Sequence, residues 1–195
     1  MKKTLLTAAI AATSFIAPAA AQAQALPAAV IAVANLERVT AECNACKTAA
    51  AALRSQAQGL QAREKALVDP IQAEQKSIQA AIDALKGAAP DAALQARVRA
   101  FQTRQQQAAE ELQRSQTQIQ RNQAYINQQI AAKLGPIYQQ VMQRRGATIM
   151  LETGSTLAAA TSVDVTNEVL AALNTAMPTL ATTAPAQTQQ QPQGR

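Results

Sequence analysis

Residues 36–60 read LERVTAECNACKTAAAALRSQAQGL and place an apolar side chain at alternating steps of three and four residues. The spacing continues to residue 85. The apolar members of this first seam are Leu36, Val39, Cys43, Cys46, Ala50, Leu53, Ala57, Leu60, Leu67, Ile71, Ile78, Ala81 and Leu85, and Glu64 and Glu74 are its polar interruptions. A sustained heptad repeat predicts a long helix whose apolar stripe packs against another helix.

A second seam with the same rhythm follows. Its apolar members are Leu94, Val98, Phe101, Ala108, Leu112, Ile119 and Ile126, and Gln105, Ser115 and Asn122 are its polar members. Between the seams lies KGAAPD, residues 86–91, in which Gly87 can end one helix and Pro90 with Asp91 can begin the next. The sequence therefore predicts a long antiparallel helical hairpin over residues 37–145, with its tip near residues 87–90.

Exceptions within the seams refine this hairpin. We expect the alignment in which Glu74 meets Gln105 and Glu64 meets Ser115, because a buried carboxylate that faced leucine would be costly. An interior proline loses a backbone hydrogen bond and clashes with the preceding turn. A kink is therefore expected at Pro70, and a bend or break where Gly135 and Pro136 follow each other.

The remaining segments predict a small β body at the base of the hairpin. The first strand is expected within residues 26–36, a second at 147–152 and a third, weaker one in STLAAAT, residues 155–161. Residues 146–179 should also contain a short helix, capped by Asp164 or Thr166 and ending before Pro178; its apolar face is Val165, Val169, Leu170 and Leu173. The fold class is thus mainly α with a small β body. So few strands leave open edges, which predicts oligomerisation.

The two ends of the chain differ from its middle. Residues 1–25 combine Lys2 and Lys3, a short apolar stretch and A-x-A sites, with cleavage expected after Ala23 or Ala25; this layout is typical of a signal peptide. Removal of the two lysines lowers the net charge from +6 to +4. The Pro- and Gln-rich tail, residues 180–195, is expected to be disordered. The chain has no His, so it lacks the commonest general base and metal ligand.

Cys43 and Cys46 are the two cysteines of the chain, and they occupy consecutive seam positions. Packing as small apolar side chains is the first interpretation. A structural disulfide, within the chain or between subunits, is a second, because export leads to an oxidising compartment. A catalytic dithiol is the third, although the surrounding heptads do not supply the βαβ context of thioredoxin-like proteins. Two thiolates without histidine cannot complete a zinc shell, so no metal site is predicted.

Several pieces occur in a definite order: a signal peptide, a strand VIAVANLERV, a hairpin, a helix base LGPIYQQV, a strand ATIMLE and a closing DVTNEVLAAL. This order resembles the Skp/OmpH family of periplasmic chaperones over nearly all of the chain except the tail. The most specific pieces are the first strand with the following Asn35, and DVTNEVL. The resemblance implies a homotrimer in which strands of three subunits form the body. It also implies that three hairpins surround a cavity that holds unfolded outer-membrane proteins without ATP.

Positive charge gathers near the predicted tip. Residues 76–104 contain two acidic residues, Asp83 and Asp91, and five basic ones, so their net charge is +3. The basic residues are Lys76, Lys86, Arg97, Arg99 and Arg104. These residues are candidates for client binding, since many outer-membrane proteins are acidic. A merely solvated helix face is the alternative interpretation of the same charges. The cysteine pair and the Gln-rich tail depart from the family pattern, and no lipopolysaccharide-binding motif can be matched.

Three classes of function therefore remain open. The first is a non-enzymatic holdase in the periplasm, without cofactor, with possible contact to a membrane surface. The second is a structural coiled-coil spacer or adaptor of the cell envelope. The third is a thiol oxidoreductase. Nucleic-acid binding is disfavoured by the export signal and by the scarcity of aromatic side chains, which are 2% of the chain.

Overall fold

The structure is a computed structural model and describes residues 28–186; the predicted signal peptide and the last nine residues lie outside this range. The elements are β1 (Ile31–Ala34), α1 (Leu36–Glu42), α2 (Asn44–Ala84), α3 (Ala92–Arg145), β2 (Ile149–Glu152), two short 3-10 helices η1 (Thr153–Ser155) and η2 (Thr161–Val163), and α4 (Thr166–Ala176). The prediction of a mainly helical chain with a small β component is confirmed.

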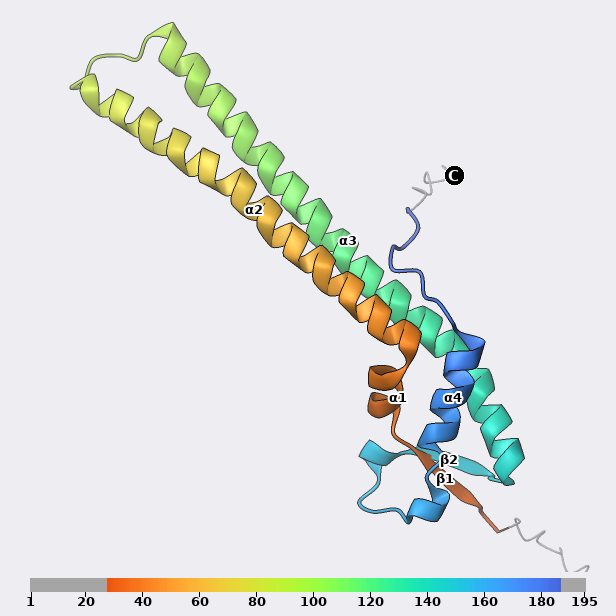
Figure 1. The fold of residues 1–195 in the computed structure, drawn as a ribbon. Helices are drawn as coiled ribbons and strands as arrows, with labels where there is room; N and C mark the ends of the chain where they lie inside the picture. Colours follow the sequence, from red (N-terminus) through yellow and green to blue (C-terminus); the bar gives the residue numbers. More distant parts are fainter. Residues whose placement is uncertain (1–27, 187–195) are drawn as a thin grey trace, which may run out of the picture.

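Helices α2 and α3 lie side by side and form an arm that projects from a small body (Figure 1). Side chains bond across the arm in three places: Gln56 with Asn122, Arg63 with Glu111, and Glu74 with Arg97. Across these three pairs the residue number in α3 falls as the residue number in α2 rises, so the two helices run in opposite directions. At the far end Gly87 has a φ of 93°, which suits glycine, and the Asp91 side chain caps α3 by accepting a 2.7 Å hydrogen bond from the Leu94 N–H.

Two details of the predicted alignment are wrong. Glu74 does not take Gln105 as its polar partner, because the longer Arg97 reaches it from nearer the tip. Gln105 and Glu64 are both exposed rather than seam members. Neither proline ends its helix, because α2 continues through Pro70 and α3 continues through Pro136. In Figure 1 the teal end of α3 beside α4 runs at an angle to the rest of that helix.

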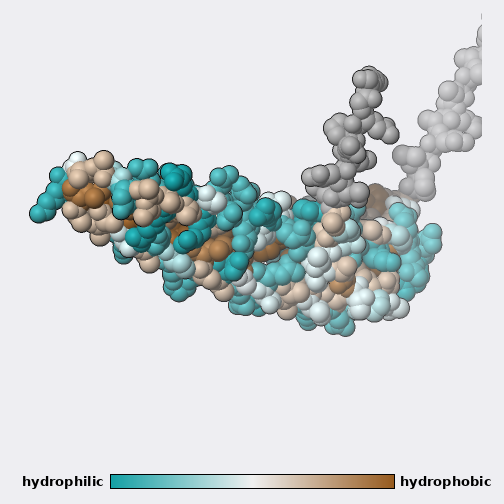
Figure 2. Space-filling view, turned by 90° about the horizontal axis from the view of Figure 1, so that it is seen from above, coloured by the Kyte–Doolittle hydropathy of each residue, from teal (hydrophilic) through white to brown (hydrophobic). Residues whose placement is uncertain are grey.

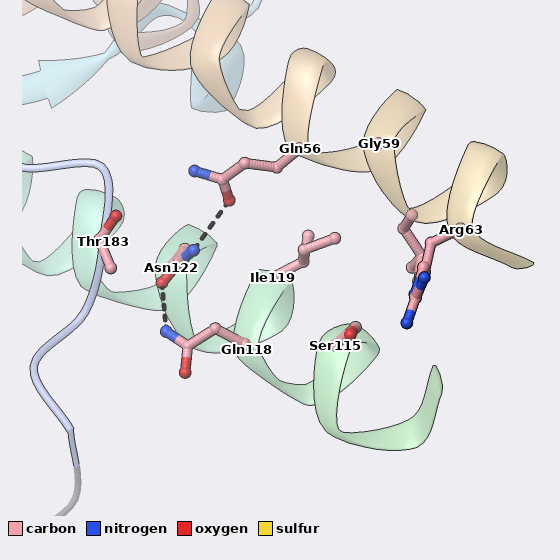
Figure 3. A pocket seen from close by; sticks show the side chains of 9 residues that line it. Gln56, Gly59, Arg63, Ser115, Gln118, Ile119, Asn122 and Thr183 are labelled. Atoms are coloured by element: carbon pink, nitrogen blue, oxygen red, sulfur yellow. Dashed lines mark hydrogen bonds between the residues drawn. The ribbon is translucent and has the colours of Figure 1, made fainter. Parts of the chain in front are cut away.

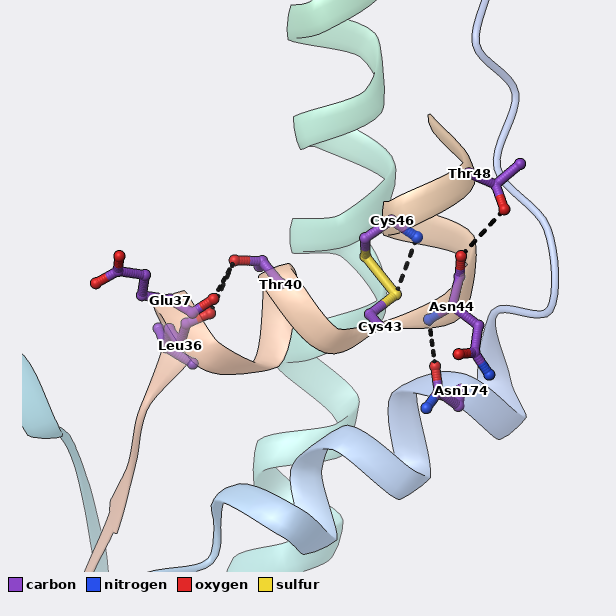
Figure 4. Close-up of a disulfide and its surroundings, with 8 residues drawn as sticks. All are labelled: Leu36, Glu37, Thr40, Cys43, Asn44, Cys46, Thr48 and Asn174. Carbon is purple, nitrogen blue, oxygen red and sulfur yellow. Dashed lines mark hydrogen bonds between the residues drawn. A yellow bond between two sulfur atoms is a disulfide. The ribbon is translucent and has the colours of Figure 1, made fainter. Parts of the chain in front are cut away.

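The first helix is not continuous with α2, contrary to the uninterrupted seam that the sequence predicts. Cys43 separates α1 from α2 with a φ of −58° and a ψ of 129°, which are not helical values. Its sulfur accepts a 3.2 Å hydrogen bond from the Cys46 N–H and is bonded to the Cys46 sulfur (Figure 4). The heptad rhythm passes through this position because both helices contribute side chains to the same core.

Strands β1 and β2 form a two-stranded parallel sheet, with Ile31 opposite Ile149. Parallel strands need a long crossover connection, and here the arm itself is that connection. The predicted third strand in residues 155–161 is wrong. Residues 156–160 form no strand, and Leu157 is fully exposed. The other side of β1 is bridged instead at Val33 by Asp164.

The hydrophobic core lies where the base of the arm meets the body. Its buried members come from β1, from α1, α2, α3 and α4 and from residues that cap these helices. They are Ala32, Ala34, Val39, Cys43, Ala45, Cys46, Leu134, Ile137, Val141, Val165, Val169, Leu173 and Met177. Within residues 28–186, no helix combines the length and the apolar character that crossing a bilayer requires. We call β1, β2, α1 and α4 the body, residues 44–56 with 122–145 the root of the arm, and residues 57–121 the distal arm.

Candidate functional site

The chain after α4 lies along the root of the arm (Figure 1). We call this segment, residues 178–186, the strap. Leu180, Thr182 and Ala184 are half-buried, whereas the residues between them are exposed, and this period of two is that of an extended chain. The strap corrects the prediction of a disordered tail from Leu180, because its backbone finds hydrogen-bond partners on the arm as far as Pro185.

Gln129 of α3 holds the strap by both atoms of its amide. Its Oε1 accepts a 3.1 Å hydrogen bond from the Ala181 N–H, and its Nε2 donates one of 2.9 Å to the Ala181 carbonyl oxygen. One side chain therefore satisfies both backbone groups of one residue, as a neighbouring strand would in a sheet. The carboxamide is itself oriented by a contact of its Nε2 with the Tyr125 carbonyl.

Asn122, which lies on α3 nearer the tip than Gln129, is the centre of a buried polar network (Figure 3). Its side chain is 4% exposed. The Oδ1 atom accepts hydrogen bonds from Gln118 at 2.7 Å and from the Ala184 N–H at 2.8 Å, and the Nδ2 atom donates to Gln56 at 2.8 Å. Gln56 in turn donates to the Thr182 carbonyl oxygen. The network is satisfied only with the strap in place, and this matters because unpaired buried polar groups are costly.

A groove of about 430 Å³ continues from the strap toward the tip, between α2 and α3 (Figure 3). A Cβ atom at Gly59 would meet nothing within 4 Å, so the wall is open there. Thr183 borders the groove at its root end and Arg63 lies on its wall. The lining residues are Gln56, Gly59, Leu60, Arg63, Ser115, Gln118, Ile119, Asn122 and Thr183.

The predicted basic residues are distributed over the outer part of the distal arm rather than gathered in one site. Arg97 donates hydrogen bonds to the Glu74 carboxylate at 2.7 Å and to the Ser77 hydroxyl. The hydrogen bond from Arg97 lowers the pKa of Glu74. With Glu74 included, residues 74–104 hold five basic and three acidic side chains, a balance of +2. Among residues 28–186, no carboxylate lies within 4.0 Å of the four exposed cations Lys76, Lys86, Arg99 and Arg104.

Cys43 and Cys46 are joined by a disulfide in the core, with Cα atoms 5.1 Å apart (Figure 4). Their residues are 0% and 7% exposed, so the packing and the disulfide interpretations hold together. Thr48 and Asn174 flank the bridge, and the Asn44 N–H donates to the Asn174 side chain of α4. The disulfide ties the junction residue Cys43 to the first turn of α2, and the hydrogen bond between Asn44 and Asn174 joins that turn to α4. In the described part of the chain, no group of three or more His, Cys, Asp or Glu residues could hold a metal ion.

The starts of α1 and α4 are bonded to each other. Asn35 caps α1, and its N–H donates a 2.9 Å hydrogen bond to the Thr166 hydroxyl. The Asp164 carboxylate accepts from the N–H and the hydroxyl of Thr166, and both bonds lower the pKa of Asp164. The two sequence pieces that most specifically resemble Skp/OmpH proteins, Asn35 after the strand and DVTNEVL, therefore meet in space and hold α1 and α4 of the body together.

Comparison with known proteins identifies the fold. The family model for outer membrane proteins of the OmpH-like type matches residues 30–173. The chain belongs to the OmpH-like family. A crystal structure from Caulobacter crescentus, described as an OmpH-like outer membrane chaperone, has a TM-score of 0.69 and 20% sequence identity. That similarity covers 85% of the present chain and 96% of the other. No curated protein matches the chain. The strap lies beyond the part that the OmpH-like family model matches.

The strap contacts are the part of the site that sequence reasoning missed. Asn122 stood out as a polar seam member, and the structure gives it a partner. Gln56, Gln118 and Gln129 carry no such signal, because glutamine is frequent over the whole arm. An alternation of half-buried and exposed positions in a Thr- and Ala-rich tail is equally weak as a signal.

Proposed function

We propose that the protein is an ATP-independent periplasmic holdase that binds unfolded outer-membrane proteins in a cavity between the arms of several copies, and that it performs no catalysis. Membership of the OmpH-like family supports a chaperone role in general. The fold supports the finer proposal, because an arm that stands clear of its body has both of its sides open to a client. Figure 2 shows brown apolar patches in the middle and near the tip of the arm, bordered by teal polar side chains.

A trimer is the assembly that we propose. The outer edge of β2 pairs with no strand in the described part of the chain, and Ile149 and Leu151 on it are 41% and 38% exposed. Val30 and Ile31 are also exposed beside them. An open edge with aliphatic side chains favours pairing with another chain. Further copies joined through this edge would place several arms around one space.

The holdase proposal is tested with a denatured outer-membrane β-barrel diluted into buffer without nucleotide. The protein should suppress light scattering by the aggregating barrel, and high salt should weaken the effect because salt screens attraction between exposed charges. A distal variant with Lys76→Glu, Lys86→Glu, Arg99→Glu and Arg104→Glu should lose much of the suppression.

A root variant is the matched control for charge. Lys47→Glu, Arg54→Glu, Lys133→Glu and Arg144→Glu change the same four charges on exposed side chains of the root and should leave most of the suppression intact. Equal losses in both variants would leave only an effect of net charge and would remove the assignment to the distal arm. A wild-type protein that binds a folded envelope partner but does not delay aggregation would favour the spacer function instead.

The assembly is tested by sedimentation. Leu151→Asp should dissociate the trimer, because a carboxylate would be buried at the pairing edge. Ile82→Asp is the control, since Ile82 is 41% exposed on the distal arm and should not change the mass. A monomeric wild type would contradict the cavity.

A further inference from the structure

We propose that the root of the arm is a binding site for extended, unfolded polypeptide, recognised through its backbone, and that residues 181–185 of the chain's own tail occupy it until another polypeptide displaces them. The site consists of Gln56 on α2 and Asn122 and Gln129 on α3, together with Arg121 at the adjoining end of the distal arm. Only the identity of the displacing chain, an unfolded client, rests on the proposed holdase function.

Side chains of the arm bind the strap through the main-chain groups of the strap. Hydrogen bonds reach the N–H and the carbonyl oxygen of Ala181, the carbonyl oxygen of Thr182, the N–H of Ala184 and the carbonyl oxygen of Pro185. Within residues 28–186, no strap side chain takes part in a hydrogen bond with the arm. Every polypeptide offers the same backbone groups, so the site does not depend on the sequence that it holds.

The groups that hold the strap are oriented by the arm itself. Gln118 donates to Asn122, Asn122 donates to Gln56, and Gln129 contacts the Tyr125 carbonyl. Such support keeps donors and acceptors in place when the occupant leaves, which reduces the ordering cost of the next one. The four binding side chains come from two facing helices, so an occupant bridges α2 and α3.

The strap itself is suited to being displaced. Its residues are small, and Leu180 is the strap residue that packs against the hydrophobic core. Ala181, Thr183 and Pro185 are exposed. The groove of about 430 Å³ begins at Thr183 and continues past Gly59 to Arg63. An extended client can therefore enter this open part first and then replace the strap residue by residue toward Gln129.

Two full-length variants separate the occupant from the site. Ala181→Pro with Ala184→Pro removes the two strap N–H donors and leaves the arm unchanged, so it should release the strap. Gln129→Ala in that released chain removes the principal holding group. Gln128→Ala is the matched control, because Gln128 is an exposed neighbour that takes no part in the hydrogen bonds between the arm and the described strap residues. Circular dichroism should show that each variant keeps the helix content of the wild type.

The probe is a fluorescein-labelled peptide with the sequence of residues 178–186. A labelled peptide of the same composition in scrambled order is measured beside it, and fluorescence anisotropy reports the binding of each. The released variant should bind both peptides several-fold more tightly than the wild type, because its site is free in a larger fraction of molecules. Added Gln129→Ala should abolish the gain and added Gln128→Ala should keep it. A released variant that binds neither peptide, or a gain that survives Gln129→Ala, would overturn the proposal.

Client assays keep this inference apart from the proposed function. If the wild type suppresses aggregation and neither strap release nor Gln129→Ala alters client affinity, the root site is not used by clients and the holdase function stands. If the wild type does not suppress aggregation while the released variant binds peptides through Gln129, the holdase function falls and the peptide site stands.

Discussion

The root and the distal arm consist of the same two helices but are held together in different ways. At the root, α2 and α3 contribute Cys46, Leu134, Ile137 and Val141 to a core that α4 and the sheet complete. Over residues 57–121 the buried side chains are Ile78 and Ala108, at 7% and 6% exposure. Two helices in contact can bury only one stripe each, and burial becomes complete only where a third layer covers them.

This difference indicates how the work is divided along the arm. The root is fixed by the core, the disulfide elbow and the strap, so it determines the direction in which the arm leaves the body. The distal arm is held by a thin seam and by exposed ion pairs such as Arg63 with Glu111, so it can adjust to a bound chain. Local stability should therefore fall from root to tip.

The largest effect is expected from truncation of the core. Leu173→Ala should lower the free energy of unfolding by about 3 kcal/mol, because Leu173 is fully buried and its neighbours cannot close the cavity. Ile78→Ala should cost less than half as much, since the open seam can relax around it. Urea unfolding followed by circular dichroism measures both variants. Equal losses would mean that the distal seam is packed as firmly as the core at the base of the arm.

A smaller effect is expected from loss of the disulfide. Cys43→Ser with Cys46→Ser should lower the free energy of unfolding by about 2 kcal/mol, the value for a short closed loop. Hydrogen exchange should rise in α1 and the start of α2 and stay unchanged beyond residue 57. Wild type treated with reductant is the comparison, and a change in exchange near the tip would link the two regions more tightly than we propose.

The smallest effect is expected from the ion pair of the distal arm. The hydrogen bond from Arg97 holds the pKa of Glu74 below its ordinary value. The stabilisation that the Glu74–Arg97 pair gives the folded state is therefore complete above the ordinary pKa of a glutamate, about 4.3. It is lost as the pH falls through the lower pKa that Glu74 has in the folded state. Glu74→Gln should speed hydrogen exchange around residues 74–97 at pH 7, with no change in the urea midpoint. At pH values below the lowered folded-state pKa of Glu74 the wild type and the variant should become alike.

Much of the fold could be predicted because its signals are local. The two seams, the glycine and aspartate at the tip and the apolar face of α4 are read from residues a few positions apart. The predicted third strand is wrong, and the contact that the structure has instead is the bridge between Val33 of β1 and Asp164, two residues that are far apart in the sequence. The helix break at Cys43 is equally invisible in the heptad spacing.

The candidate site could be predicted only in part. The basic residues of the distal arm were named from charge alone, and the structure adds that Glu74 neutralises Arg97. The strap was missed because its partners are glutamines in an arm rich in glutamine. Which of them meets the tail depends on contacts more than 50 residues apart, such as Gln129 with Ala181.

The sequence by itself determined two long helical rods, a small apolar base and the family, because periodic apolar side chains and short motifs act through neighbours in the chain. The tertiary structure alone decided the elbow at Cys43, the partner of Glu74 and the seat of the strap. Each of these depends on which polar group comes within hydrogen-bond distance of another after folding, and several sequence-distant groups could have served equally well before the chain folded.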